Sequence, residues 1–289
     1  MDRGIRRAMA VFTATDTDSG HWRAPSSPAK YVLLIRTVRN WPAYVSRRWG
    51  GRKETVLVTR RGGLRCVVPR PLASAFREVV VYDTYEITQM AGELGPAPVI
   101  VDLGANAGYF SLYTLAHMPG ARVYAYEPLP GNLAVLERNR AQNPGLGDRL
   151  RVFAKAVTGR PCDSIEFHVQ ATSDVSMSAS LDKRALSGDS RSVRVEATTL
   201  DQIIESNKLD TIDLLKIDCE GAEYEILFET PPVRFERIRR IVLETHVRPD
   251  LPWGHADIVK FLRTQGYAVR EMVQHAGRSH LIWAQRRGA

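Results

Sequence analysis

The fold class is decided by the stretch Val99-Ile100-Val101-Asp102-Leu103-Gly104-Ala105-Asn106-Ala107-Gly108-Tyr109-Phe110. It begins with a mostly apolar, β-branched run that predicts a buried strand, and from Tyr109 onward it predicts a helix that ends before Pro119. Gly104 and Gly108 lie in the loop between, where the missing Cβ lets the backbone turn sharply and approach a ligand. The free N–H groups of the helix start favour an anion such as a carboxylate. The stretch therefore predicts a site for a nucleotide-like ligand.

Two classes of cofactor use this geometry, and the spacing of the loop distinguishes them. Dinucleotides favour G-x-G-x-x-G after the strand, whereas this loop reads D-x-G-x-N-x-G, with Asn106 in place of a middle glycine. The acid Asp102 would repel a pyrophosphate but suits a ligand with a cationic amine. S-adenosylmethionine carries an ammonium and a carboxylate, so we expect Asp102 near the amine and loop N–H groups on the carboxylate.

A second predicted strand, residues 122–126, is followed directly by Glu127-Pro128. An acid at the end of the second strand is where a ribose diol is hydrogen-bonded in nucleotide-binding folds. The alternative is an ordinary strand, turn and helix in which the acid only caps the helix.

Three blocks in this order resemble the FkbM family of S-adenosylmethionine-dependent methyltransferases, over roughly residues 80–250. The resemblance implies a Rossmann-like class I methyltransferase fold of the α/β class, with a mostly parallel seven-stranded sheet and an antiparallel edge strand. It also implies methylation of a hydroxyl on a sugar, polyketide or similar natural product. The blocks are residues 102–111, Tyr126-Glu127-Pro128 with Asn132-Leu133, and residues 215–223, with Thr199-Leu200-Asp201 and Leu243-Glu244 in support.

The predicted cofactor site extends from the glycine loop to neighbouring segments. In similar methyltransferases the segment before the first core strand closes over the cofactor, which makes Glu86 a candidate, although a structural role is an equal alternative. A third strand, residues 150–157, is expected to end near the adenine. The predicted cofactor-binding residues are Asp102, Gly104, Ala105, Asn106, Gly108, Tyr109, Phe110, Glu127, Pro128, Asn132, Ala156, Asp218 and Glu86.

The predicted catalytic residues follow the strand at 212–217, which brings Asp218, Glu220 and Glu223 to its carboxyl end, where open α/β sheets bind ligands. Methyl transfer is an in-line displacement, so the enzyme positions the acceptor and takes its proton if that proton is not already lost. We predict Asp218 as the base or the acceptor-orienting residue. Glu220 and Glu223 either bind the acceptor or cap the following helix.

The next predicted strand, residues 241–246, ends in Glu244 and His246. Histidine titrates near neutral pH, so His246 is a candidate proton acceptor, with a structural role as the alternative. With Asp218 and Glu220 these side chains could also hold a divalent cation, but the spacing does not require one and we predict no metal ligand. The predicted catalytic residues are Asp218, His246 and Glu220, and the predicted substrate-binding residues are Glu220, Glu223, Glu244, His246, Ser178 from a hydroxyl-rich loop, and Trp253.

The composition fits one α/β domain with extensions. The chain has 289 residues, of which 44% are hydrophobic, and no apolar run approaches the length of a membrane span. Residues 1–70 hold 15 Lys or Arg against 4 Asp or Glu, while the rest holds 25 against 28. We predict a mobile basic leader at 1–29, a helix and β-hairpin extension at 30–78, and a methyltransferase domain at 79–289 with a β insertion at 158–198.

The basic leader could attract nucleic acid, an anionic membrane surface or a phosphorylated substrate, or it is simply a solvated extension. No basic and aromatic recognition motif accompanies the charge, so nucleic acid is not the expected main partner. A homodimer through the N-terminal extension is a further expectation. The start of the chain does not resemble a secretory signal, and the three widely spaced cysteines suggest a reducing cytoplasm.

The sequence therefore predicts a cytoplasmic S-adenosylmethionine-dependent O-methyltransferase, which releases S-adenosylhomocysteine and acts on a small hydroxylated substrate in secondary metabolism, one that can be phosphorylated or nucleotide-linked. The alternatives are an N-methyltransferase, an NAD-dependent oxidoreductase, and a catalytically inert binding protein of the same fold. Asp102 and the missing middle glycine count against the oxidoreductase.

Overall fold

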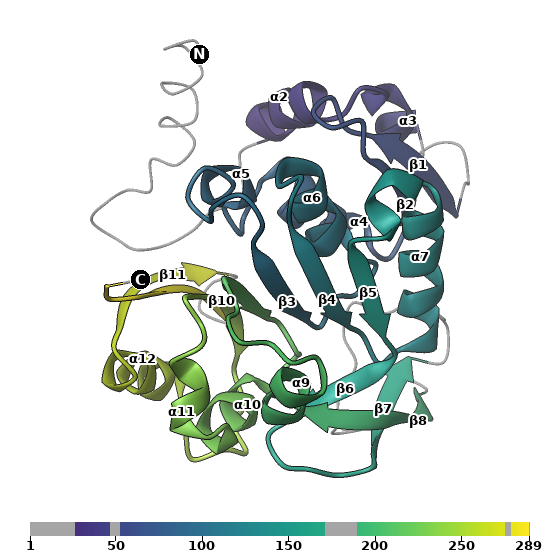
Figure 1. The fold of residues 1–289 in the computed structure, drawn as a ribbon. Helices are drawn as coiled ribbons and strands as arrows, with labels where there is room; N and C mark the ends of the chain where they lie inside the picture. Colours follow the sequence, from purple (N-terminus) through teal and green to yellow (C-terminus); the bar gives the residue numbers. More distant parts are fainter. Residues whose placement is uncertain (1–26, 47–52, 171–189, 275–278, 289) are drawn as a thin grey trace.

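The computed structural model describes residues 27–46, 53–170, 190–274 and 279–288 (Figure 1). Its centre is a seven-stranded sheet in the order β11-β12-β10-β9-β3-β4-β5. The strands from β5 to β10 in this order are parallel, and β12 runs antiparallel to both of its neighbours. The predicted fold class is confirmed. The strand bounds are β3 (Val99–Leu103), β4 (Arg122–Tyr126), β5 (Leu150–Phe153), β9 (Leu214–Ile217), β10 (Arg240–His246), β11 (Tyr267–Gln274) and β12 (Ser279–Arg286).

The central strands β3 and β9 carry almost only buried residues, as expected for parallel strands covered on both faces. Their register pairs Leu103 with Ile217 on one side and with Tyr126 of β4 on the other. The carboxyl ends of β4, β3 and β9 therefore meet at one edge of the sheet. That edge receives the loops that carry the predicted site residues.

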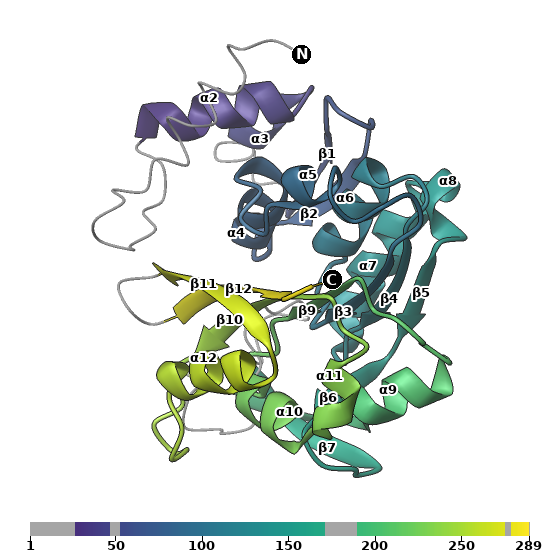
Figure 2. The same ribbon diagram turned by 60° about the vertical axis from the view of Figure 1, so that its left-hand side comes forward.

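Helices cover both faces of the sheet (Figure 2). One face packs against α4 (Ala73–Phe76), α5 (Ile87–Met90), α6 (Tyr109–His117) and α7 (Pro130–Ala141), with α8 (Pro144–Gly147) following. The other face packs against α9 (Leu200–Ser206), α10 (Glu223–Glu229), α11 (Pro232–Phe235) and α12 (His255–Thr264). Among the described helices, none combines the length and the apolar composition that a bilayer crossing requires.

The N-terminal extension contains α2 (Ser27–Thr37), α3 (Trp41–Ser46) and a hairpin of β1 (Glu54–Val58) and β2 (Arg65–Pro69). The predicted helix and hairpin are present, although the helix begins at Ser27, before the expected start of the extension at residue 30. The side-chain carbonyl of Asn139 on α7 accepts a hydrogen bond from the Val67 amide at 2.6 Å. Leu34 and Leu57 join the same apolar core as α6. The extension is thus packed onto the helices that cover one face of the main sheet.

A second, three-stranded sheet has the order β6-β8-β7 and contains β6 (Lys155–Thr158), β7 (Ser164–Gln170) and β8 (Ser190–Thr199). The single strand expected at 150–157 is wrong in this respect, because the chain leaves the main sheet after Phe153 and Lys155–Thr158 pairs with β8 instead. A short π-helix (η1, Arg77–Val81) precedes α5. Most of the predicted leader, and Ser178 with its loop, lie outside the described residues.

Candidate active site

The loop between β3 and α6 lies directly against the end of β9. Gly104 has a φ of 75°, in the left-handed region, and a Cβ on it would lie 1.8 Å from the carbonyl oxygen of Asp218. Only glycine permits both the turn and this approach. Asn106 is also left-handed, with a φ of 51°, a conformation that asparagine tolerates better than most residues. The glycine loop therefore brings the carboxyl end of β9 beside the predicted cofactor site.

Glu127 follows β4 and is almost fully buried. Its Oε2 accepts a hydrogen bond from the Asn106 amide at 2.8 Å, and its Oε1 accepts from the Leu129 amide at 2.9 Å and from Asn132 Nδ2 at 3.3 Å. Burial raises the pKa of Glu127 to about 7, because the charged carboxylate loses its water there. The structure thus brings together Asn106, Glu127 and Asn132, which the sequence assigned to one site.

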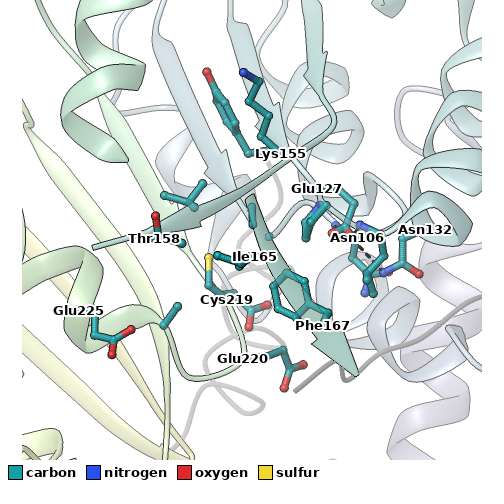
Figure 3. A pocket seen from close by; sticks show the side chains of 18 residues that line it. Asn106, Glu127, Asn132, Lys155, Thr158, Ile165, Phe167, Cys219, Glu220 and Glu225 are labelled. Carbon is teal, nitrogen blue, oxygen red and sulfur yellow. Dashed lines mark hydrogen bonds between the residues drawn. The ribbon is translucent and has the colours of Figure 1, made fainter. Parts of the chain in front are cut away.

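A pocket opens beside Glu127, with about 830 Å³ of empty space including its mouth to solvent. In Figure 3, Asn106, Glu127 and Asn132 lie on one side of Phe167, and Cys219 and Glu220 lie on the other. The lining residues are Gly104, Asn106, Tyr126, Glu127, Pro128, Leu129, Asn132, Lys155, Ala156, Val157, Thr158, Ile165, Phe167, Asp218, Cys219, Glu220, Ala222 and Glu225.

The apolar wall of the pocket was missed in the sequence. Ile165 and Phe167 belong to β7, which the alternation of polar and apolar residues identified as a strand without showing what its apolar side faces. Seven of the predicted cofactor residues do line the pocket: Gly104, Asn106, Glu127, Pro128, Asn132, Ala156 and Asp218.

Asp102 lies elsewhere than expected. Its side chain has no exposed surface, its Oδ1 is 3.2 Å from Lys216 Nζ, and its Oδ2 accepts a hydrogen bond from Ser111 at 2.6 Å. The carboxylate is buried beside Lys216 and is not among the residues that line the pocket, so the expected contact with a ligand amine stays a prediction that the pocket lining does not support. The physical reason is Lys216, a buried cation of β9 that needs a counter-charge. The signal in the sequence was a lysine inside an otherwise apolar strand.

Lys216 also organises the glycine loop. Its ammonium donates to the Gly104 carbonyl at 2.7 Å and to the Leu103 carbonyl at 3.3 Å. Burial alone would lower the pKa of Lys216, but the carboxylates of Asp102 and Asp218 hold that pKa above its ordinary value. We call Lys216 and Asp102 the buried pair. The pair stabilises the glycine loop through the hydrogen bonds that Lys216 donates to the Leu103 and Gly104 carbonyls.

The other predicted residues that do not line the pocket have packing or structural partners. Tyr109 donates to the Val67 carbonyl at 2.9 Å, and the Phe110 ring packs edge-on against Tyr85. Ala105 is buried in the core, and a Cβ on Gly108 would lie 2.8 Å from Leu136 Cγ on α7. Outside the glycine loop, Glu86 pairs with Arg270 at 2.5 Å, and Trp253 packs edge-on against Phe228.

A group of acids surrounds one histidine at the carboxyl ends of β9 and β10. Asp218 Oδ2 accepts a hydrogen bond from the Tyr85 hydroxyl at 3.1 Å and is 3.5 Å from Lys216 Nζ. His246 is 3.0 Å from the buried Glu223 through Nδ1, and its Nε2 is 3.8 Å from Glu220 and 3.9 Å from Glu244. We call Asp218, Glu220, Glu223, Glu244 and His246 the carboxylate–histidine cluster.

Glu223 holds the loop of this cluster in place. Its Oε1 accepts hydrogen bonds from the amides of Cys219 at 2.9 Å and Gly221 at 3.1 Å. Between these two residues, Glu220 adopts a left-handed φ of 53°, which is uncommon for a residue other than glycine. Glu223 therefore ties the loop and His246 together, and its side chain is not exposed to a substrate.

The charges in the cluster shift its protonation. Burial acts to lower the pKa of His246, but the hydrogen bond to Glu223 and the surrounding carboxylates raise it to about 11. Burial and the neighbouring acids raise the pKa of Glu244 to about 7 and that of Glu220 above its ordinary value. The raised pKa favours the protonated form of His246, which donates hydrogen bonds. Proton acceptance by His246 stays a prediction from the sequence, and the carboxylates are the alternative acceptors.

Comparisons with known proteins identify the family of the chain. A family model described as "Methyltransferase FkbM domain" matches residues 102–269. The chain is 28% identical over 198 residues to the 31-O-demethyl-FK506 methyltransferase FkbM of Streptomyces tacrolimicus, covering 61% of this chain and 75% of that protein. It is 33% identical over 144 residues to the 2-O-methyltransferase NoeI of Sinorhizobium fredii, covering 46% and 57%.

Further matches differ in how much of the other protein they cover. The AMB antimetabolite synthetase AmbE of Pseudomonas aeruginosa is 31% identical over 226 residues, which is 67% of this chain but only 10% of AmbE. Among solved structures, the precorrin-6y C5,15-methyltransferase of Geobacter metallireducens has a TM-score of 0.42 at 15% identity, covering 71% of this chain and 88% of that one. At such identity the likeness concerns the fold alone.

Proposed function

The chain belongs to the FkbM methyltransferase family, and we propose that it transfers a methyl group from S-adenosylmethionine to a hydroxyl of a small natural product, sugar, nucleoside or glycan precursor. The observation that carries the choice of cofactor is Glu127, a buried carboxylate that follows β4 and lines a pocket with an apolar wall. The printed names of the relatives FkbM and NoeI, which specify O-methylation, support oxygen as the acceptor atom.

The residues that line the pocket fit the parts of this cofactor. The Glu127 carboxylate suits the two ribose hydroxyls, which donate hydrogen bonds, and Asn132 supports it from α7. Phe167, Ile165 and Ala156 suit the flat face of an adenine. Asp218 and Glu220 give the opposite side of the pocket a negative charge. That charge favours the cationic sulfonium and ammonium groups, a role that the sequence assigned to Asp102.

When bound, the cofactor supplies a methyl group on a sulfonium sulfur, and its transfer to oxygen leaves S-adenosylhomocysteine. The chain's own part is to position the acceptor hydroxyl and to accept its proton. Asp218 is the first candidate for that proton, since it lines the pocket and its side chain is about one quarter exposed. Glu220 is the second. His246, as a hydrogen-bond donor, would orient the acceptor oxygen.

Calorimetric titration tests the cofactor part of the proposal. We expect S-adenosylhomocysteine to bind and NAD not to bind. Glu127→Ala should weaken S-adenosylhomocysteine binding by at least tenfold, while Glu137→Ala on the exposed side of α7 should leave it unchanged. Binding of NAD in place of S-adenosylhomocysteine, or equal affinity of both variants, would overturn this assignment.

The acceptor class is tested by incubation with isotope-labelled S-adenosylmethionine and a panel of hydroxylated sugars, nucleosides and macrolides, read by mass spectrometry. We expect label on an oxygen of at least one class. Label found only on nitrogen in amine-bearing acceptors would contradict O-methylation and leave the cofactor assignment intact.

A further inference from the structure

Three side chains of different types converge where β9 and β10 end. Asp218 follows β9, and Glu244 and His246 lie at the carboxyl end of β10. These strands are parallel neighbours with Ile217 opposite Leu243, so their carboxyl ends lie together. One possible ligand atom from each of the three side chains lies within 4.8 Å of the other two. None of the three is fully exposed, and each retains some access to solvent.

His246 is oriented as a metal-bound histidine is. Its Nδ1 is 3.0 Å from Glu223 Oε1, and Glu223 is itself fully buried and hydrogen-bonded to two loop amides. Histidines that bind metals commonly donate their other ring N–H to a carboxylate in this way, which fixes the tautomer and the ring orientation. Here that contact leaves Nε2 directed among the remaining carboxylates.

The distances around Nε2 leave a gap between ligand atoms. Glu244 Oε1 is 3.9 Å and Glu220 Oε2 is 3.8 Å from it, and both separations are too long for a hydrogen bond. The separation of Glu244 Oε1 and His246 Nε2 leaves space for one ion between them, since a small divalent cation binds oxygen and nitrogen at about 2.0–2.2 Å.

A second observation concerns charge. Glu223 has no exposed surface, and its Oε2 has no hydrogen-bond partner among the described residues. The cluster holds four carboxylates, and the lysine and arginine side chains beside it are Lys216 and Arg248. Lys216 is already held by Asp102 and by two carbonyl groups, and Arg248 is paired with Asp250. Partly buried carboxylates without a paired cation suit a further positive ion.

We infer that Asp218, Glu244 and His246 bind one divalent cation, Mn²⁺ or Mg²⁺, beside the pocket that Asp218 lines. Carboxylates suit both ions and an imidazole suits a transition metal, so Mn²⁺ fits both kinds of ligand, and three protein ligands leave positions for water or for a substrate oxygen. With His246 Nε2 on the ion, the ion takes the place of a His246 N–H in orienting the acceptor oxygen. The inference deepens the proposed function and rests on it for the role of the ion, though not for the binding itself.

The role of the ion is to hold the acceptor hydroxyl and to make its proton easier to remove. Because Asp218 binds the ion in this arrangement, the O–H proton passes to Glu220, the second proton acceptor named above, which is near the site and is not required as a ligand. The oxygen then forms the new O–C bond as the S–C bond breaks and sulfur keeps the electron pair. No oxidant or reductant is needed.

The test uses full-length protein treated with a chelator and then titrated with Mn²⁺ alone. Calorimetry and the electron paramagnetic resonance signal of free Mn²⁺ should both report about one ion per chain. Glu244→Gln and His246→Gln should weaken binding by more than tenfold. Glu223→Gln, which removes a positioning carboxylate and no ligand, should weaken it by about 10- to 100-fold. Thermal melting shows that each variant is folded.

A second group of possible ligands, different from the first, provides a matched control. It consists of His255 on α12, Glu271 on β11 and His280 on β12. His255→Gln and Glu271→Gln should leave Mn²⁺ binding unchanged. Loss of binding in these variants, unchanged affinity in Glu244→Gln and His246→Gln, or no binding by the folded wild-type protein would each overturn the inference.

Titration of S-adenosylhomocysteine into the chelator-treated protein separates this inference from the proposed function. If the nucleoside binds and Mn²⁺ does not, only the cation site is wrong. If Mn²⁺ binds as described and the nucleoside does not, the cation site stands and the cofactor assignment is wrong.

Discussion

The buried pair and the carboxylate–histidine cluster lie two residues apart along the chain, at Lys216 and Asp218, yet they balance charge in opposite ways. In the buried pair one ammonium meets one fully buried carboxylate and donates hydrogen bonds to two backbone carbonyls. In the cluster, four carboxylates surround one imidazole, and Asp218, Glu220 and His246 are each at least one quarter exposed. Paired charges that are shielded from water, as in the buried pair, stabilise the fold. Carboxylates without a paired cation, as in the cluster, are available to bind a ligand.

The largest effect is expected from breaking the buried pair. Lys216→Met leaves Asp102 as an uncompensated buried charge and should lower the free energy of unfolding by about 3–5 kcal/mol. Urea denaturation followed by circular dichroism measures this. The double variant Lys216→Met with Asp102→Asn should recover part of the loss, because no buried charge is left. A loss below about 1 kcal/mol in the single variant would contradict the role of the pair.

The cluster should respond in activity more than in stability. Asp218→Asn keeps the size of the side chain and removes its negative charge, which both proton transfer and the cation site require, so we expect methyl transfer to fall by about 10²-fold or more. The free energy of unfolding should change by less than about 1 kcal/mol, since one of several repelling charges is removed. Asp210→Asn, at an exposed turn before β9, is the matched control. Equal turnover in both variants would exclude Asp218 from the reaction.

A third, smaller effect concerns pH and Glu127. The free carboxyl has a pKa raised to about 7, and ribose hydroxyls bind best to its ionised form. Below that pH the proton must leave before the ligand binds, so affinity for S-adenosylhomocysteine should be about tenfold lower at pH 6 than at pH 8. Calorimetry at both pH values measures this. In Glu127→Gln the weaker affinity should no longer depend on pH, and an equal slope in both proteins would contradict the assignment.

The smallest effect is expected at an exposed ion pair, which provides the baseline for the comparison. Arg138 and Glu54 are 2.9 Å apart, with about half of each side chain exposed. Glu54→Gln should change the free energy of unfolding by about 0.5 kcal/mol or less, because water already screens the pair. If Glu54→Gln lowered the free energy of unfolding as much as Lys216→Met, burial would not explain why the two ion pairs are expected to differ in their contribution to stability.

Much of the fold could be predicted from local signals. Three local signals were sufficient for their own segments. The β-branched residues before Asp102 predicted a strand, the two glycines at Gly62-Gly63 predicted a hairpin turn, and the acid after the second strand was predicted at the end of that strand. The break after Phe153 could not be seen, because an apolar strand sequence does not show which neighbour it pairs with. Pairing with β8 rather than with β4 is decided by tertiary contacts.

For the site, the sequence predicted which residues follow the strands and therefore which carboxylates meet. It could not predict the ion pair between Asp102 and Lys216, since the two residues are far apart along the chain and no local pattern pairs them. It also missed Phe167, because the strand that carries it folds back over the pocket from a separate sheet. Contacts between distant segments decided both outcomes.

The central claim is that the pocket beside Glu127 holds the nucleoside of the methyl donor. A crystal structure of the protein with S-adenosylhomocysteine tests it most directly. We expect the ribose hydroxyls within hydrogen-bonding distance of Glu127, the adenine against Phe167, and the sulfur facing Asp218. A nucleoside bound away from Glu127, or one paired instead with Asp102, would contradict the account.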